Sequence, residues 1–217
     1  MKKSLCLGLA LMACGIAWAQ APGWFELKPD LRTALAVKGD AKRGLAQYES
    51  CLGCHRKDGT GRANAGIPSL AGQHATVLVK QLTDIRAGRR HNPVMQAIIV
   101  DPEITSQDVA DLAAYLKELP IPATHVKGPG KALAQGKRLY DRDCASCHGG
   151  AGEGRAADFY PRVSAQHYPY LVHESKSIRD GLRRNSNPAM VALIKGYSDA
   201  DIDAVADHMA QFPVPAK

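Results

Sequence analysis

Two short stretches of this sequence have the residue types and spacing to attach and ligate a haem. The motif Cys-x-x-Cys-His occurs at residues 51–55 and again at residues 144–148. Because residues three apart share one face of a helix, both thiols of a motif can reach the two vinyl groups along one haem edge. The following histidine can then present its imidazole to the iron. The motifs predict two covalently bound haem c groups, attached through Cys51, Cys54, Cys144 and Cys147, with proximal ligands His55 and His148.

A zinc knuckle, a redox-active cysteine pair and chance repetition are the alternatives. Zinc would need two ligand pairs that converge on one tetrahedral site, whereas each pair here has its own histidine and lies far from the other in the sequence. A thioredoxin-like pair would lie in a βαβ pattern, and none is visible. Haem attachment fits best, because the motif occurs twice in equivalent contexts.

The sixth ligand of each iron determines what the haem can do. An iron with both axial positions filled by protein shuttles electrons, while an open position can bind small molecules. Met95 and Met190 follow matching Asn-Pro pairs in the two halves, in segments expected to be loops. Because methionine paired with histidine is an electron-transfer form of ligation, we expect these two as the distal ligands. Met209 falls on the apolar stripe of a helix and is expected to be a core residue.

The elements that position these groups are repeated, because the chain is an internal duplication. Matched pairs occur in the same order along both halves: Gly44 and Gly136, Tyr48 and Tyr140, Pro68 and Pro161, Gln73 and Gln166, and His74 and His167. Prolines and glycines between residues 120 and 130 mark a linker. We predict an N-terminal domain over residues 20–122, and a linker with a C-terminal domain over residues 123–217, each domain with one haem.

Each half reads as helices and loops, so the predicted fold class is all-α. Asp40 is expected to cap a helix that leads into the first motif, and capping boxes are expected at Thr105 and Ser198. A middle helix is predicted over residues 75–87. The apolar positions expected on its counterpart are Leu171, Ile178 and Leu182.

The N-terminus predicts export. Residues 1–19 combine two lysines, an apolar run and a small-x-small site ending at Ala19, as in a secretory signal peptide. A lipoprotein cleavage site before Cys14 is the alternative. We expect a periplasmic protein, soluble or peripherally membrane-associated, because c-type haem is attached outside the bacterial cytoplasm. Of the 6 cysteines, Cys6 and Cys14 would leave with the signal, and the other cysteines are those of the two motifs.

The composition limits the kinds of partner. The formal net charge is +7 and aromatic residues make up 6% of the chain. The positive charges are scattered and no nucleic-acid motif accompanies them, so we expect no nucleic-acid partner. A haem in each half would supply the flat apolar body that few aromatic residues provide.

Taken together, the two motifs, the Gly-x-x-x-Tyr approaches and the Asn-Pro-x-Met segments resemble a c4-type dihaem cytochrome c, over roughly residues 40–213. The resemblance implies two tandem class I cytochrome c domains, one covalent haem each, packed as a pseudo-twofold pair. It also implies that the carbonyls of Pro68 and Pro161 orient the proximal histidines. Gly44 and Gly136 would allow a close helix crossing.

Two features depart from that resemblance. His208 stands where the first half has Tyr115, which leaves open a different helix crossing in the second domain. Residues 20–39 have no counterpart in the second half, and their role is unassigned.

Three functions follow from these observations. The leading one is an electron carrier, not an enzyme, between a quinol–cytochrome c reductase and a terminal oxidase or reductase. The second is the haem subunit of a periplasmic dehydrogenase. The third is a dihaem enzyme of the peroxidase or thiosulfate-oxidising type, which would need an open or unusual axial position, whereas both halves offer a matched methionine.

Overall fold

Short helices make up both halves of the computed structural model, which describes residues 27–214. The first half contains α1 (Pro29–Ala36), α2 (Ala41–Gln47), α3 (Leu52–His55), α4 (Ala75–Arg86), α5 (Pro93–Ile99) and α6 (Ser106–Glu118). The second half contains α7 (Leu133–Asp143), α8 (Ala145–His148), α9 (Tyr168–Arg179), α10 (Pro188–Ile194) and α11 (Asp199–Ala210). Extended pairing between residues 27 and 214 is limited to two isolated bridges, one in each half. The all-α prediction is confirmed.

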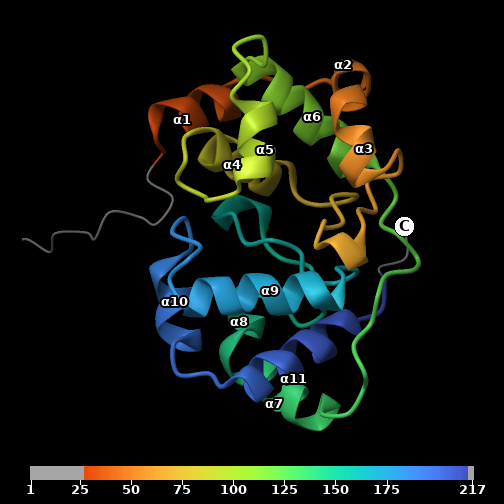
Figure 1. Ribbon diagram of the computed structural model, residues 1–217, viewed down its shortest axis with the longest axis vertical. Coiled ribbons are helices and arrows are strands. Elements are labelled where there is room, and N and C mark those ends of the chain that lie inside the picture. The colour runs from red at the N-terminus through yellow and green to blue at the C-terminus, as the bar shows by residue number, and fades with distance from the viewer. Residues whose placement is uncertain (1–26, 215–217) are drawn as a thin grey trace, which may run out of the picture.

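The two halves form two domains stacked one above the other (Figure 1). The upper domain runs from α1 to α6 and the lower one from α7 to α11, and the linker descends along one side of the molecule. No helix within residues 27–214 is long and apolar enough to cross a membrane. The predicted signal peptide, with Cys14 and Ala19, lies outside the described residues.

Each domain is built on a close helix crossing, of α2 with α6 in the first domain and of α7 with α11 in the second, as the resemblance implies. A Cβ atom on Gly44 would overlap the carbonyl of Asp111 in α6, and one on Gly136 would overlap the carbonyl of Ala204 in α11. Glycine is therefore the residue that lets each backbone pair approach. The crossing is alike in both domains, so the exchange of Tyr115 for His208 does not alter it.

The aromatic packing beside the crossing is also preserved. Tyr115 lies with its ring centroid 5.2 Å from that of Tyr48. His208 lies 5.7 Å from Tyr140 in the second domain and 4.9 Å from Phe212. The imidazole thus takes the packing position of the phenol.

The helix starts follow the predicted capping signals. The Asp40 carboxylate accepts hydrogen bonds from the backbone of Lys42 and Arg43 at the start of α2. Thr105 and Ser198 each form a complete capping box at the start of α6 and α11. These caps satisfy N–H groups that have no partner inside the helix.

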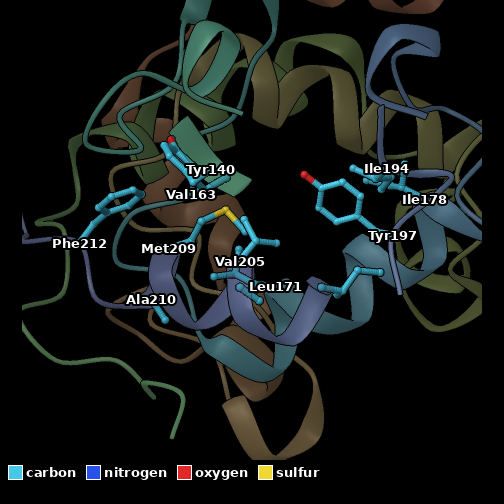
Figure 2. Packing of buried hydrophobic residues seen from close by; sticks show 12 residues of the cluster. Tyr140, Val163, Leu171, Ile178, Ile194, Tyr197, Val205, Met209, Ala210 and Phe212 are labelled. Atoms are coloured by element: carbon cyan, nitrogen blue, oxygen red, sulfur yellow. The ribbon is translucent and has the colours of Figure 1, made fainter. Parts of the chain in front are cut away.

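The predicted apolar stripes are buried, with one exception. Met209 is 6% exposed in the core of the second domain, as predicted (Figure 2). Leu182 is 67% exposed, so its expected place on the middle helix is wrong. The reason is that α9 ends at Arg179 and the chain turns at Gly181, which has a φ of 73°.

The segment without a counterpart includes α1, which packs against α4 and α6. Leu31 and Ala34 of α1 are almost fully buried in the core of the first domain. Asp30 pairs with Arg89 at 2.7 Å. Part of the unassigned segment 20–39 therefore covers one face of the first domain.

Candidate haem sites

Each Cys-x-x-Cys-His motif occupies one helical turn held by a buried tyrosine. The hydroxyl of Tyr48 donates to the carbonyl of Arg56 at 2.9 Å, and that of Tyr140 donates to the carbonyl of Gly149 at 2.6 Å. Both acceptors directly follow the motif histidines. Each tyrosine therefore fixes the end of its motif against the preceding helix.

The chain after each histidine is fixed by a matched arginine. Arg62 donates to the carbonyl of Gly53 at 3.1 Å, and Arg155 donates to that of Ser146 at 2.8 Å. Both acceptors lie between the two cysteines of a motif. The two halves therefore build the same frame around each cysteine pair.

Both motif histidines are buried, with exposed fractions of 5% for His55 and 8% for His148. Burial lowers the pKa of each ring, and the carbonyls of Pro68 and Pro161 act in the opposite direction. The Nδ1 atom of His148 lies 2.9 Å from the Pro161 carbonyl oxygen. Nδ1 of His55 is buried and has no hydrogen-bond partner. A neutral ring whose Nδ1 faces a carbonyl leaves Nε2 for a metal.

The first thiol of each motif is not activated in the way that a redox-active cysteine is. Burial raises the pKa of Cys144 to about 12, and it also raises the pKa of Cys51. Reactive cysteine pairs have a lowered thiol pKa instead. Within residues 27–214 no cluster of three or more histidine, cysteine or acidic side chains could hold a metal ion. The donor chemistry therefore disfavours the redox-pair and zinc alternatives.

Met95 and Met190 lie in the first turns of α5 and α10, so the expectation of loops is wrong. Asn92 accepts from the Met95 backbone N–H at 3.1 Å, and Asn187 accepts from that of Ala189 at 2.8 Å. Asparagine at the N-cap followed by proline favours this helix start.

In each domain the methionine and the first motif cysteine contact the same apolar core. Met95 and Cys51 pack against the core cluster of the first domain, and Met190 and Cys144 pack against that of the second. Figure 2 shows the second cluster, to which helices α7, α9, α10 and α11 contribute. An apolar core bordered by a thiol and a thioether, in a domain whose motif histidine is buried, suits a haem, so the residues present fit the group that the motifs imply.

The two domains hold each other by reciprocal hydrogen bonds. The Gln73 side chain bonds both backbone groups of Arg162, at 2.9 and 3.0 Å. The Gln166 side chain does the same to Ser69, at 3.0 and 2.9 Å. Ser69 and Arg162 directly follow the two prolines beside the motif histidines. The contact is therefore pseudo-twofold and lies next to both sites.

A buried charged cluster, which the sequence did not reveal, lies elsewhere in the interface. Arg90 and Arg183 both pair with Glu174, at 3.1 and 2.6 Å. Each arginine also donates to Gln81 at 3.1 Å. The repeat would have provided a signal, since Arg90 matches Arg183 and Gln81 matches Glu174 along the two halves. Like-charged guanidinium groups around one carboxylate are stable only where they are well hydrogen-bonded.

Two tandem helical domains, each with a haem-attachment motif that ends in a buried histidine, define a class of electron-transfer protein. The family model for cytochrome c matches residues 41–120 and 133–213, and the chain belongs to this family. Its domains bind covalent haem c, and the two motifs give this chain two haems.

Similarity to individual proteins indicates which type of cytochrome c this chain is. Cytochrome c4 of Azotobacter vinelandii is 32% identical over 194 residues, which is 82% of this chain and 91% of the relative. The reduced cytochrome c4 structure from Pseudomonas stutzeri superposes with a TM-score of 0.71 at 28% identity, over 81% of this chain and 99% of that one. The thiosulfate dehydrogenase electron acceptor of Stutzerimonas stutzeri strain A1501 is 36% identical over 171 residues, 74% of this chain and 78% of the relative. This chain is a c4-type dihaem electron-transfer cytochrome, its partners are redox proteins, and it is not an enzyme.

Proposed function

We propose that each iron is held between a histidine and a methionine, His55 with Met95 and His148 with Met190. Both positions would then be filled by protein, which suits one-electron transfer and leaves no position for substrate. The covalent haem supplies the one-electron chemistry, and this chain supplies the ligands, the apolar surroundings and the contact between the two sites.

The observation that carries the proposal is the matched placement of these residues. In each domain a thiol and a thioether border one apolar core, and the motif histidine is buried. The two cores are joined through the segments that follow Pro68 and Pro161. A pair of sites joined in this way can act as one electron store.

The ligand proposal is tested by absorbance of the oxidised protein in the far red, where a Met–Fe(III) bond gives a weak band. We expect about half of the band to be lost in Met95→Leu or in Met190→Leu, and all of it in the double variant, because each methionine serves one iron. Met209→Leu is the matched control, since Met209 lies in the core. A double variant with an unchanged band would exclude both ligands.

For the physiological role we propose a periplasmic carrier, released by cleavage near Ala19, that takes electrons from a quinol–cytochrome c reductase and delivers them to a terminal oxidase. A second candidate role is the electron acceptor of a dehydrogenase, which is favoured by the similarity to a thiosulfate dehydrogenase electron acceptor. Purification from the native periplasm with its bound partners, followed by rapid mixing with each reduced partner, distinguishes the two. The true donor should reduce both haems within one encounter.

A further inference from the structure

The two domains differ at a pair of matched residues, Ile104 in the first domain and Tyr197 in the second. Arg86 donates to the carbonyl of Ile104 at 3.1 Å, and Arg179 donates to the carbonyl of Tyr197 at 3.2 Å. The backbone is therefore placed alike in both domains. The aliphatic side chain of Ile104 in the first domain is thus replaced by the phenol of Tyr197 in the second.

The phenol of the second domain has a specific partner. The Tyr197 hydroxyl donates to the Asp143 carboxylate at 2.5 Å, and Arg142 pairs with the same carboxylate oxygen at 2.6 Å. Asp143 directly precedes Cys144, an attachment cysteine. The first domain has Ser50 at the corresponding position, and its hydroxyl donates to the Gln47 carbonyl at 3.3 Å. The charged cluster Arg142–Asp143–Tyr197 is thus specific to the second domain.

The burial of these groups determines which charge acts on the interior. The Asp143 side chain is 13% exposed, whereas that of Arg142 is 65% exposed. Water screens the charge of the exposed guanidinium more strongly than that of the mostly buried carboxylate, so the negative charge has the larger effect on the interior. Tyr197 is 8% exposed and belongs to the apolar core, and its hydroxyl is turned away from Ile178 and Ile194 (Figure 2).

The carboxylate is ionised and its charge reaches the attachment site. The hydrogen bond from Arg142 lowers the pKa of Asp143, and the bond from Tyr197 adds to this. Asp143 directly precedes Cys144, so its charge lies close to the haem edge that this cysteine would hold.

We propose that the Arg142–Asp143–Tyr197 cluster lowers the reduction potential of the C-terminal haem. Reduction adds one electron to the iron, supplied in the test by a soluble redox mediator. A fixed negative charge nearby disfavours that added electron. Tyr197 acts as a positioning residue, because its hydrogen bond and its packing in the core hold the carboxylate beside Cys144. This inference rests on the proposed function.

A spectroelectrochemical titration of the holoprotein tests the inference. In Asp143→Asn the amide can still accept from Tyr197, but the charge is gone. At a fixed poise we expect the ratio of reduced to oxidised C-terminal haem to rise roughly tenfold, since about 1.4 kcal/mol changes an equilibrium constant tenfold. The N-terminal haem should keep its ratio. Comparison with Met95→His and Met190→His variants assigns the two transitions.

Asp141→Asn is the matched control. It removes a neighbouring negative charge whose side chain is 53% exposed and paired with Lys137. Its effect on either haem should be much smaller, because solvent screens it. An equal shift in both variants would overturn the inference, since burial would then not matter.

A reciprocal change keeps the test decisive if Asp143→Asn fails to fold. Ser50→Asp combined with Ile104→Tyr builds the same acid and phenol in the first domain, and the ratio of reduced to oxidised N-terminal haem should then fall. Unchanged ratios in the folded variants, with the far-red band intact, would overturn this inference and leave the proposed function standing. If the oxidised wild-type protein showed no far-red band, the ligand proposal itself would be refuted.

Discussion

His74 and His167 cross the domain interface in opposite directions. Nε2 of His74 lies 2.8 Å from the carbonyl oxygen of Glu153, and Nε2 of His167 lies 2.7 Å from that of Thr60. Nδ1 of His167 accepts a hydrogen bond from the Val126 backbone N–H at 3.2 Å. A ring that accepts at Nδ1 and faces a carbonyl at Nε2 is neutral, with its proton on Nε2.

This arrangement predicts a loss of stability in mild acid. Burial lowers the pKa of both His74 and His167. The unfolded chain therefore binds protons more readily, and this contribution is complete above the ordinary histidine pKa of about 6.5 and is lost as the pH falls below it. In His167→Gln the free energy of unfolding, measured with denaturant at several pH values, should depend less on pH. His173→Gln is the control, because that side chain is 72% exposed. Identical pH dependence in the wild type and His167→Gln would contradict the prediction.

The reciprocal glutamines predict a measurable cost of separating the domains. Gln73→Leu keeps the approximate volume but leaves the backbone N–H and C=O of Arg162 unpaired. Each unsatisfied buried group costs about 1–3 kcal/mol. The free energy of unfolding should fall accordingly, and the Arg162 amide should exchange its hydrogen faster. Gln47→Leu is the control, because Gln47 bonds Asp108 on an exposed surface. Equal effects of the two substitutions would mean that the interface contributes nothing.

Local signals in the sequence predicted the starts of several helices, because a capping side chain acts over a few residues. Asp40, Thr105 and Ser198 begin helices as expected. Leu182 was misplaced because apolar spacing does not show where a helix ends. The cluster of Arg90, Arg183 and Glu174 was missed for a different reason: charged side chains are expected to be solvated until the other domain is placed against them.

The covalent haem is predicted to complete the core of each domain. A domain of about a hundred residues has a marginal core of its own. Cys51→Ala with Cys54→Ala should therefore leave the first domain poorly folded, while the second stays native. Circular dichroism and limited proteolysis would show the loss, and Ser50→Ala is a control that leaves both thiols in place. Undiminished helicity and protease resistance of a haem-free first domain would contradict the prediction.

Replacing a distal ligand should move one potential selectively. Met190→His exchanges a thioether for imidazole, a better donor to Fe(III), so the potential of the C-terminal haem should fall strongly. The N-terminal haem should shift much less, because Met190 belongs to the other core. A redox titration followed by absorbance resolves the two transitions, with Met209→Leu as the control. If neither transition moves, Met190 is not a ligand.

We predict that electrons exchange between the two haems within one molecule, at a rate that does not depend on ionic strength. The linker is anchored to the second domain, since His125 Nε2 lies 2.7 Å from the Ala210 carbonyl oxygen and the Gly130 N–H donates to Asp207 at 2.6 Å. With the glutamine contacts, this anchoring holds the domains in one orientation. Reduction by an acidic partner should slow as ionic strength rises, because the positive net charge, +7 for the full chain and 7 − 2 = +5 without Lys2 and Lys3 of the signal peptide, steers the encounter and salt screens it. Exchange between the haems should keep its rate, because nothing has to diffuse.

Photoreduction of one haem at several ionic strengths measures both rates. Exchange that is slow, or that depends on protein concentration, would mean two independent cytochrome domains on a tether.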